Sequence, residues 1–362
     1  MATREATWAF RDRHADEFAR AYFRRFGDSV VSSIGIGTYL GAPTDEGDDH
    51  YQDAITQALS GGCNVVDTAI NYRHQRSERV VGSALSDVAI DREEVLVATK
   101  GGFIPFDGDR PDDPGQHVRE EYVDTGIVSS DDLVRGMHCM TPDFLDDQLD
   151  RSLANLGLDT VDLYYVHNPE TQLSVRSREA VYDGLEAAFT RLEQRAAAGD
   201  LRHYGVATWH AFRVPATDDQ YLSLPEIVRR ARSAAREVGN ETTHFRAIQL
   251  PFNVHAAEAF TVAAHDGPDG PQSALSFAHE AGLNVFTSAS IAQGQLASGM
   301  PEAVAERLTG ETAVQRAINF ARSGPGVTAA LVGMGSPEHV SENLGAGRSP
   351  PMGADAFDAT FE

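Results

Sequence analysis

Short apolar runs alternate along this chain with longer segments whose apolar residues recur at helical spacing. The apolar runs predict strands over residues 30–37, 65–67, 94–99, 161–167, 203–207, 247–250, 284–288 and 329–333. The segments between them predict helices over residues 48–60, 77–86, 141–156, 178–198, 224–238, 272–281, 312–323 and 337–344. Eight strand and helix pairs in one chain favour a closed (β/α)8 TIM barrel over an open doubly wound sheet.

Two segments depart from this alternation. Residues 1–28 carry aromatic and charged residues at helical spacing, which predicts an N-terminal helical extension packed outside the barrel. Residues 101–136 are rich in Pro, Gly and Asp and form a long loop insertion after the third strand. A loop of this length is usually a lid, a binding loop or a disordered segment. Since it leaves the carboxyl end of a strand, we expect it to cover substrate. We predict one barrel domain over 29–347 and a loosely ordered tail over 348–362.

The charge balance excludes two classes of partner. The chain has 54 acidic and 30 basic residues and a formal net charge of -24, so neither nucleic acid nor an anionic membrane is expected to bind it. Its first residues are charged throughout, and no apolar run approaches the roughly 18 residues of a spanning helix. We therefore predict a cytoplasmic protein. Its two cysteines, Cys63 and Cys139, are too few for a disulfide framework.

The basic residues comprise 29 arginines and a single lysine, Lys100. An acidic, lysine-poor composition is typical of halophilic proteins, because concentrated salt screens their self-repulsion. A GC-rich genome that favours arginine codons is the alternative. Either pressure replaces lysine wherever arginine serves equally well. Lys100 is therefore expected at a site that requires a compact ammonium instead of a planar guanidinium.

Three of the predicted strands end on an ionisable residue, namely Asp67, Lys100 and His167, and Tyr72 follows Asp67 by five positions. The carboxyl ends of the strands surround the active site in a parallel barrel, so we expect these four side chains to converge there. An ordinary phenol has a pKa of about 10 and is a weak acid at neutral pH. A neighbouring ammonium, held by a carboxylate, stabilises the phenolate. This arrangement predicts Tyr72 as a proton donor.

Other kinds of chemistry lack the residues that they need. His167 is expected to polarise a carbonyl oxygen or to orient the phenol. There is no Ser or Cys nucleophile beside a base, no second carboxylate at glycosidase-like separation, and no Gly-x-Gly-x-x-Gly after an early strand. The pair His138-Cys139 has no second pair at a metal-ligand spacing, so no metal site is predicted.

Seven segments between about residue 31 and residue 343 form a recognisable set, namely GIGTYLG, DTAINYRHQRSERVVGSAL, VLVATK, LGLDTVDLYYVHNPE, IQLPFN, SIAQGQL and LVGMGSPEHVSENL. With these segments the chain resembles the aldo-keto reductases. The resemblance implies direct hydride transfer, without a metal, between NADP or NAD and a small carbonyl, sugar or alcohol. It implies that Tyr72 is the general acid or base, that Lys100 and Asp67 tune it, and that His167 orients the carbonyl.

The resemblance also implies a set of cofactor-binding residues. These are Gly37, Thr38, Tyr39, Thr208, Gln249, Ser288, Gly333, Gly335, Ser336, His339, Glu342 and Asn343. Five residues depart from the family pattern. Ala207-Thr208 replaces a Ser-Asn pair, Ser288 stands where many members stack a tyrosine on the nicotinamide, and Gly333 and His339 replace a lysine and an arginine that often grip the 2′-phosphate of NADP. NAD and NADP therefore both remain open.

Two other functions are compatible with the same residues. A cofactor-binding regulatory or scaffold protein with little turnover is one alternative, because the family pattern is altered at Ala207-Thr208 and Ser288. An isomerase or aldolase with Lys100 as a Schiff-base lysine is the other. A neighbouring Asp67 would hold that lysine protonated and non-nucleophilic, which argues against it. The expected partner is a small-molecule carbonyl or alcohol, and no oligomeric state is predicted.

Overall fold

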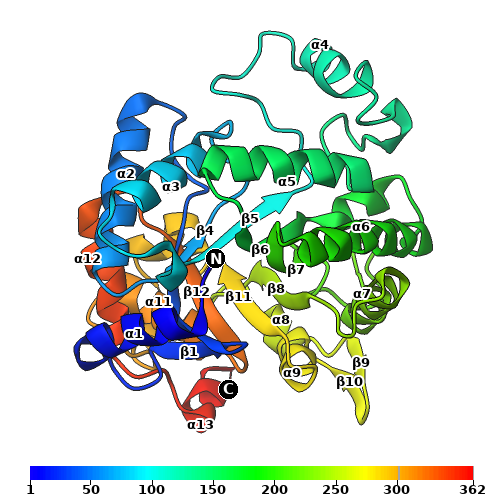
Figure 1. Cartoon of the computed structure of the whole chain (residues 1–362). Coiled ribbons are helices and arrows are strands. Elements are labelled where there is room, and N and C mark those ends of the chain that lie inside the picture. Colours follow the sequence, from blue (N-terminus) through cyan, green and yellow to red (C-terminus); the bar gives the residue numbers. More distant parts are fainter. Residues whose placement is uncertain (301, 362) are drawn as a thin grey trace.

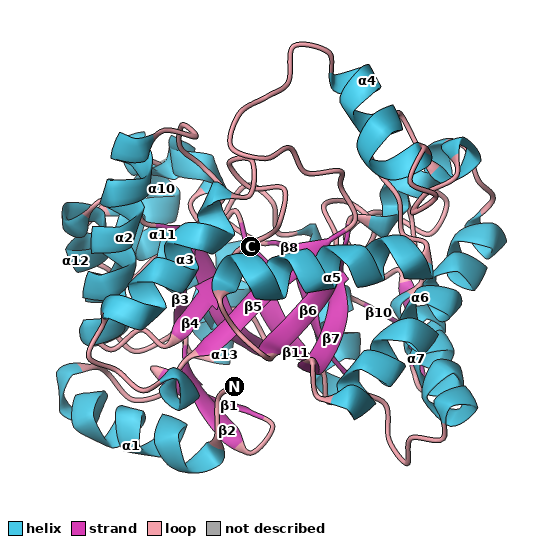
Figure 2. Ribbon diagram, turned by 45° about the horizontal axis from the view of Figure 1, so that its top comes forward, coloured by secondary structure: helices cyan, strands magenta, loops and turns pink. Residues whose placement is uncertain are grey.

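The computed structural model describes residues 1–300 and 302–361. Eight parallel strands form a closed barrel in the order β11-β12-β3-β4-β5-β6-β7-β8 (Figures 1 and 2). Their bounds are β3 Ile34–Gly37, β4 Val65–Asp67, β5 Leu96–Gly101, β6 Val161–His167, β7 Leu201–Ala207, β8 Phe245–Pro251, β11 Asn284–Ser288 and β12 Val327–Gly333. The predicted (β/α)8 TIM barrel is confirmed.

An outer layer of helices covers the barrel (Figure 2). The helices that follow the strands are α2 Asp45–Ser60, α3 Arg76–Asp87, α5 Pro142–Leu156, α6 Arg178–Ala198, α7 Leu224–Val238, α9 Ala274–Glu280, α11 Ala313–Ser323 and α12 Pro337–Gly345. Their ends follow the local sequence. The Thr44 hydroxyl caps α2 by accepting a hydrogen bond from the Gly47 amide at 3.2 Å. Gly157 and Gly199 end α5 and α6 at positive φ, which a residue without Cβ adopts readily.

The strand register brings the predicted catalytic residues to one end of the barrel. Asp67 pairs with Gly37 on the neighbouring strand β3. Farther round the barrel, His167 pairs with Ala207, and Ala207 pairs with Gln249. A slip by one residue would turn each of these side chains to the opposite face of its strand. The register of the barrel therefore positions the site.

The N-terminal segment is only partly helical. Helix α1 covers Arg4–His14, whereas β1 Phe23–Phe26 and β2 Ser29–Ser32 form an antiparallel hairpin around a turn at Gly27, which has a φ of +60°. The predicted helical extension over residues 1–28 is wrong at its end, where Phe23–Phe26 form the strand β1. The predicted first strand over residues 30–37 is wrong in its length, because it is divided between β2 and β3.

The hairpin closes the amino-terminal end of the barrel. The sequence-based prediction that this segment packs outside the barrel is therefore wrong for the hairpin. Phe26 and Val31 from the hairpin share one buried cluster with side chains of the barrel strands. The Phe26 ring lies 5.9 Å from the ring of Phe286 on β11 and 5.5 Å from that of His203 on β7. These contacts exclude water from the closed end and leave the carboxyl end as the mouth of the barrel.

The insertion after β5 has its own small apolar core. It contains α4 Pro114–Val118, a π-helical turn Arg119–Val123 and a 3-10 turn Ser130–Asp132. The buried residues of this core are Ile104, Val118, Tyr122, Val128, Cys139 and Phe144. The insertion lies above α5, where it projects from the barrel (Figure 1). Within residues 101–136 only Phe103 borders the central cavity. The expected cover over substrate is therefore limited to that side chain.

Several short elements complete the described chain. They are α8 Glu258–Thr261, a hairpin of β9 His265–Gly267 and β10 Gly270–Gln272, α10 Glu302–Ala305 and α13 Ala354–Asp358, with 3-10 turns at Ala15–Glu17, Arg92–Glu94, Pro169–Ser174, Ala292–Ser298, Ala346–Arg348 and Ala359–Phe361. Within the described ranges, no helix has both the length and the apolar character to cross a membrane.

The tail packs against the barrel and is not loosely ordered. Phe357 on α13 is 1% exposed, and its ring lies 6.3 Å from Phe252 and 5.2 Å from Phe320. The Met352 amide donates to the Ser323 hydroxyl at 2.8 Å. Aromatic burial therefore anchors a segment whose small and polar residues predict disorder. Glu362, the last residue of the predicted tail, lies outside the described residues.

The net charge leads to a first prediction, that added salt stabilises the fold. The carboxylates exceed the cationic side chains and leave a net charge of -24, so the carboxylates repel one another. Salt screens this repulsion, because the Debye length falls from about 10 Å at 0.1 M to about 3 Å at 1 M. We expect the thermal midpoint to rise by several degrees between 0.1 M and 2 M KCl. A parallel NaCl series separates ionic strength from a specific effect of potassium. A constant or falling midpoint would contradict the high-salt adaptation.

Candidate active site

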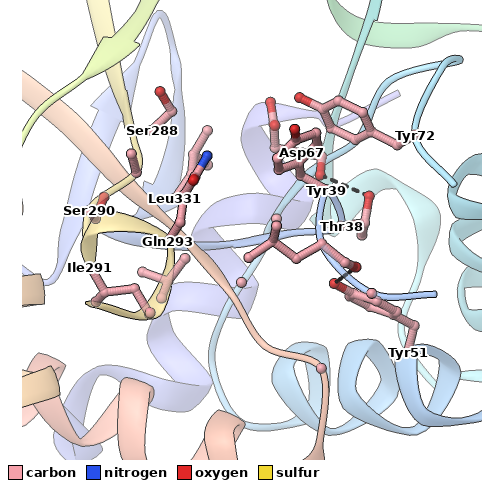
Figure 3. A pocket seen from close by; sticks show the side chains of 18 of the residues that line it. Thr38, Tyr39, Tyr51, Asp67, Tyr72, Ser288, Ser290, Ile291, Gln293 and Leu331 are labelled. Atoms are coloured by element: carbon pink, nitrogen blue, oxygen red, sulfur yellow. Dashed lines mark hydrogen bonds between the residues drawn. The ribbon is translucent and has the colours of Figure 1, made fainter. Parts of the chain in front are cut away.

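A cavity of about 960 Å³ opens at the carboxyl ends of the barrel strands. Of the four predicted catalytic residues, Asp67, Tyr72 and His167 line it. Lys100 does not line it and is fully buried. Figure 3 shows Asp67 and Tyr72 on one side of the cavity and Ser288 on the other. The structure therefore brings the predicted residues together, with the lysine in a layer behind them.

Lys100 is held by two oxygen atoms inside the barrel. Its Nζ lies 2.5 Å from Asp67 Oδ1 and donates to the Thr68 carbonyl oxygen at 2.8 Å. The other carboxylate oxygen of Asp67 accepts from Gln249 Nε2 at 2.7 Å. Burial acts to lower the pKa of Lys100, but Asp67 and Tyr72 outweigh it and leave that pKa above its ordinary value. The side chain is therefore an ammonium at neutral pH.

The phenol of Tyr72 adjoins this ammonium. Lys100 Nζ lies 4.8 Å from the centroid of the Tyr72 ring, and the rings of Tyr39 and His167 lie 5.0 and 6.0 Å from it. Burial raises the pKa of Tyr72, and the Lys100 charge acts in the opposite direction without fully offsetting it. The predicted direction of the lysine effect is correct, but the net pKa is raised. Tyr72 is therefore a neutral phenol that carries a proton to donate.

His167 is held as a neutral imidazole. Burial lowers its pKa well below the ordinary value, and the Lys100 charge and His138 act in the same direction. Its Nδ1 is buried and has no hydrogen-bond partner within the described chain. The main-chain oxygen of His167 accepts from His138 Nε2 at 2.8 Å, and Gln172 Nε2 donates to His138 Nδ1 at 2.8 Å. These two bonds fix the end of β6.

Eleven of the twelve predicted cofactor positions line the same cavity. They are Gly37, Thr38, Tyr39, Thr208, Gln249, Ser288, Gly333, Gly335, His339, Glu342 and Asn343. Ser336 is not among the lining residues. Its hydroxyl instead caps α12 by accepting from the His339 amide at 3.4 Å. The predicted set therefore encloses one continuous space, and Ser336 has a structural partner of its own.

The lining residues fit a nicotinamide dinucleotide. A Cβ at Gly333 or Gly335 would meet no protein atom within 4 Å, so the backbone there is open to a ligand that approaches closely. Thr208 Oγ1 is buried and has no hydrogen-bond partner in the part of the chain that the structure describes. Because Gln249 Nε2 is occupied by Asp67, its Oε1 remains to accept from a carboxamide. Unpaired buried polar atoms on a cavity wall are hydrogen-bonding groups for a polar ligand.

Sequence reasoning missed the mouth of the cavity and one of its walls. Leu40, Met137 and Trp209 line it although they are 45%, 51% and 38% exposed. Leu40 and Trp209 come two or three positions after a strand end, which is a signal that could have found them. Met137 has no such signal. The same holds for the residues of α2 on the wall, because only the packing of α2 beside the barrel brings them to the cavity.

The candidate metal pair has an ordinary structural role. His138 is engaged by His167 and Gln172, and Cys139 lies in the core of the insertion. Within the described residues, His, Cys, Asp and Glu form no group of three or more that could hold a metal ion.

Comparison with known proteins gives the family. The model of the Aldo/keto reductase family matches residues 33–220, which is more than half of the chain. The chain belongs to the aldo/keto reductase family. Membership confirms the predicted class, an NAD(P)-dependent oxidoreductase, and the family match covers the segments from β3 to the loop after β7 that supply Asp67, Tyr72, Lys100 and His167.

Individual aldo/keto reductase relatives are distant. A putative voltage-gated potassium channel subunit beta of Schizosaccharomyces pombe is 26% identical over 339 residues, with 89% of this chain and 87% of that protein covered. An NADP(+) aldo-keto reductase of the same organism is 26% identical over 51% of this chain and 44% of its own length. The solved holo form of an aldo-keto reductase from Bacillus halodurans has a TM-score of 0.64 at 19% identity, covering 94% of this chain and 95% of that chain.

The histidine that fixes β6 leads to a prediction about acid stability. Burial lowers the pKa of His138 to about 4 from an ordinary value of 6.5. The unfolded chain therefore takes up a proton below pH 6.5, whereas the folded chain resists until about pH 4, so this stability is present above pH 6.5 and is lost as the pH falls. We expect urea unfolding to show a loss of about 1 kcal/mol through His138 between pH 7.5 and pH 5.5.

The control for this measurement is a pair of variants. His138→Asn should reduce the pH dependence of the unfolding free energy by about that amount, whereas His279→Asn, at an exposed position, should leave it unchanged. The same pH dependence in both variants would show that another group takes up the proton.

Proposed function

We propose that this protein reduces small aldehydes or ketones, or oxidises the corresponding alcohols, with NAD or NADP as cofactor. The observation that carries the proposal is the buried ammonium of Lys100, which lies between Asp67 and the Tyr72 ring. A phenol, an ammonium and a carboxylate at the end of a cavity form a proton donor for a carbonyl oxygen. The neutral His167 on the same cavity supplies a second polar contact.

In the proposed mechanism, the protein moves one proton. When bound, the reduced nicotinamide would supply the hydride to the carbonyl carbon. Tyr72 donates its phenolic proton to the carbonyl oxygen, and the Lys100 ammonium stabilises the phenolate that is left. Asp67 keeps Lys100 charged and turned toward the phenol. In the oxidation of an alcohol, the same phenolate takes the hydroxyl proton back.

His167 orients the substrate and does not act as an acid. Since its pKa is well below the ordinary value, the ring is neutral and can donate or accept a hydrogen bond without carrying a charge. Gln249 and Thr208 would hold the carboxamide of the nicotinamide. Gly333 and Gly335 would allow the cofactor phosphates to approach the backbone.

The rim of the cavity supports a preference among carbonyl substrates. Leu40, Phe103, Met137 and Trp209 line the cavity, and all four present apolar or aromatic surface to a ligand that enters. Such a rim favours aldehydes and ketones with an apolar group over free sugars, because a sugar would leave its hydroxyl groups without partners there.

The role of Tyr72 is tested by removing its hydroxyl. We expect Tyr72→Phe to lower kcat for 4-nitrobenzaldehyde at least a hundredfold, the size of a general-acid contribution, while cofactor binding stays within about twofold. Stopped-flow oxidation of NADH and of NADPH measures both quantities. Tyr221→Phe removes a hydroxyl that donates to the Ala264 carbonyl oxygen away from this network and should retain turnover. Activity of Tyr72→Phe near that of the wild type would remove this residue from its role.

The role of Lys100 is tested by keeping its charge and changing its shape. We expect Lys100→Arg to lose at least about a hundredfold in kcat, because a planar guanidinium does not fit the fully buried place of the ammonium. Lys100→Met, which fits the space without a charge, should lose as much and shows the effect if the arginine variant folds poorly. Circular dichroism verifies folding in both. Activity of either variant within tenfold of the wild type would contradict the proposed role.

A second function has one observation in its favour. One relative, matched over 89% of this chain, is named as a putative voltage-gated potassium channel subunit beta. A regulatory subunit of this fold would bind cofactor without needing fast turnover. The two proposals differ in one measurement. Reduction of aldehydes over many cycles supports the reductase, whereas tight cofactor binding with less than one turnover per minute supports the regulatory subunit.

A further inference from the structure

We propose that the cavity selects NAD over NADP, because its wall offers carboxylates and no cation to a 2′-phosphate. This inference rests on the proposed function and names its cofactor. It is carried by the charges of the lining residues and by the arrangement of α2 and α12 around the outer end of the cavity.

The cavity extends from the barrel mouth to a space between two outer helices. Helices α2 and α12 lie side by side in Figure 1 and contact each other, and Gln57 on α2 donates to the Ser341 hydroxyl on α12 at 2.9 Å. Residues from the first turns of both helices line the cavity. Since Tyr72 and His167 mark the end where the nicotinamide must react, the far end between the helices is left for the adenosine.

The far end carries negative charge. Its ionisable lining residues are Glu46 and His50 on α2 and His339 and Glu342 on α12. Throughout the described chain, no lysine or arginine lines any part of the cavity. A 2′-phosphate brings about 1.5 to 2 negative charges at pH 7 and is usually bound by arginine or lysine. Here it would meet two carboxylates and no permanent cation.

The arginines behind this wall are held in ion pairs, although Arg73 Nη1 and Arg76 Nε have no hydrogen-bond partner among the described residues. Arg73 is 6% exposed; it donates through Nε to the Ala42 carbonyl oxygen at 3.0 Å and forms an ion pair with Asp48 at 2.5 Å. Its guanidinium lies 5.0 Å from the centroid of the Tyr51 ring. Arg76 is paired with Asp45 and Asp48. Turning either arginine toward a phosphate would break its ion pairs, so neither is a ready cation for the cavity.

The same groups suit the 2′-hydroxyl of NAD. A carboxylate accepts a hydrogen bond from a ribose hydroxyl, and this is how acidic residues select NAD in other nucleotide folds. The attraction for the hydroxyl and the repulsion of the phosphate act in the same direction, so they add in the difference between the two affinities. The selection therefore needs no residue beyond those on the wall.

The experiment measures binding of each reduced cofactor directly. Trp209 lines the cavity, so quenching of protein fluorescence reports occupancy without turnover. At pH 8 and 0.1 M KCl we expect the Kd for NADH to be at least tenfold lower than that for NADPH. The ratio should shrink in 1 M KCl, because salt screens the repulsion. An NADPH affinity equal to or higher than that of NADH would overturn the inference and leave the proposed reductase intact. If neither cofactor binds, the proposed function fails and this inference fails with it.

Two pairs of matched variants locate the selection. His339→Arg adds a cation to the wall and should tighten NADPH at least fivefold with little change for NADH, whereas Glu338→Gln makes the same change in net charge beside the cavity lining and should not. Glu46→Gln should lower the ratio of the NADPH Kd to the NADH Kd severalfold. Asp49→Asn, at an exposed position on the same helix that does not line the cavity, should leave this ratio unchanged. Equal effects within each pair would show that net charge, and not the wall, sets the preference.

Discussion

The ion pair between Lys100 and Asp67 is the interaction on which the site depends. Taking two charges out of water costs several kcal/mol per ion, and this is offset only where the geometry is close and the remaining polar atoms are bonded. Both conditions hold here, because Lys100 also donates to the Thr68 carbonyl oxygen and Asp67 accepts from Gln249. Removing either partner would leave an uncompensated charge inside the barrel.

The barrel supplies what this pair needs. The two residues stand at the ends of adjacent strands, β4 and β5, and Gln249 reaches them from β8 on the other side of the barrel. The hairpin of β1 and β2 closes the opposite end of the barrel with Phe26 and Val31. Water therefore reaches the pair from one side only, which keeps the local dielectric low and lets the ammonium act strongly on the Tyr72 phenol.

The sequence predicts the parts of this protein that depend on local pattern. Strand ends are visible as apolar runs that stop at an ionisable residue, so Asp67, Lys100 and His167 could be placed without a structure. The hairpin could not, because Phe18, Tyr22 and Phe26 keep a helix-like spacing through a segment that forms a strand near Gly27. The raised pKa of Tyr72 could not be predicted from the sequence either, since it depends on burial by segments that are distant in the chain. The α2 wall of the cavity arises from helix packing alone.

One compositional pressure links the surface of this protein to its cofactor site. In a chain with 30 basic and 54 acidic residues, many arginines form ion pairs with surrounding carboxylates, as Arg73 and Arg76 do beside the cavity. The single lysine is neutralised by Asp67 inside the barrel. Among the described residues, no lysine or arginine lines the cavity, so an anionic ligand would be held there by backbone amides, hydroxyls and shape. A cofactor with fewer negative charges suits such a wall, and the proposed selection of NAD over NADP would follow from the same excess of carboxylates that gives the protein its net charge.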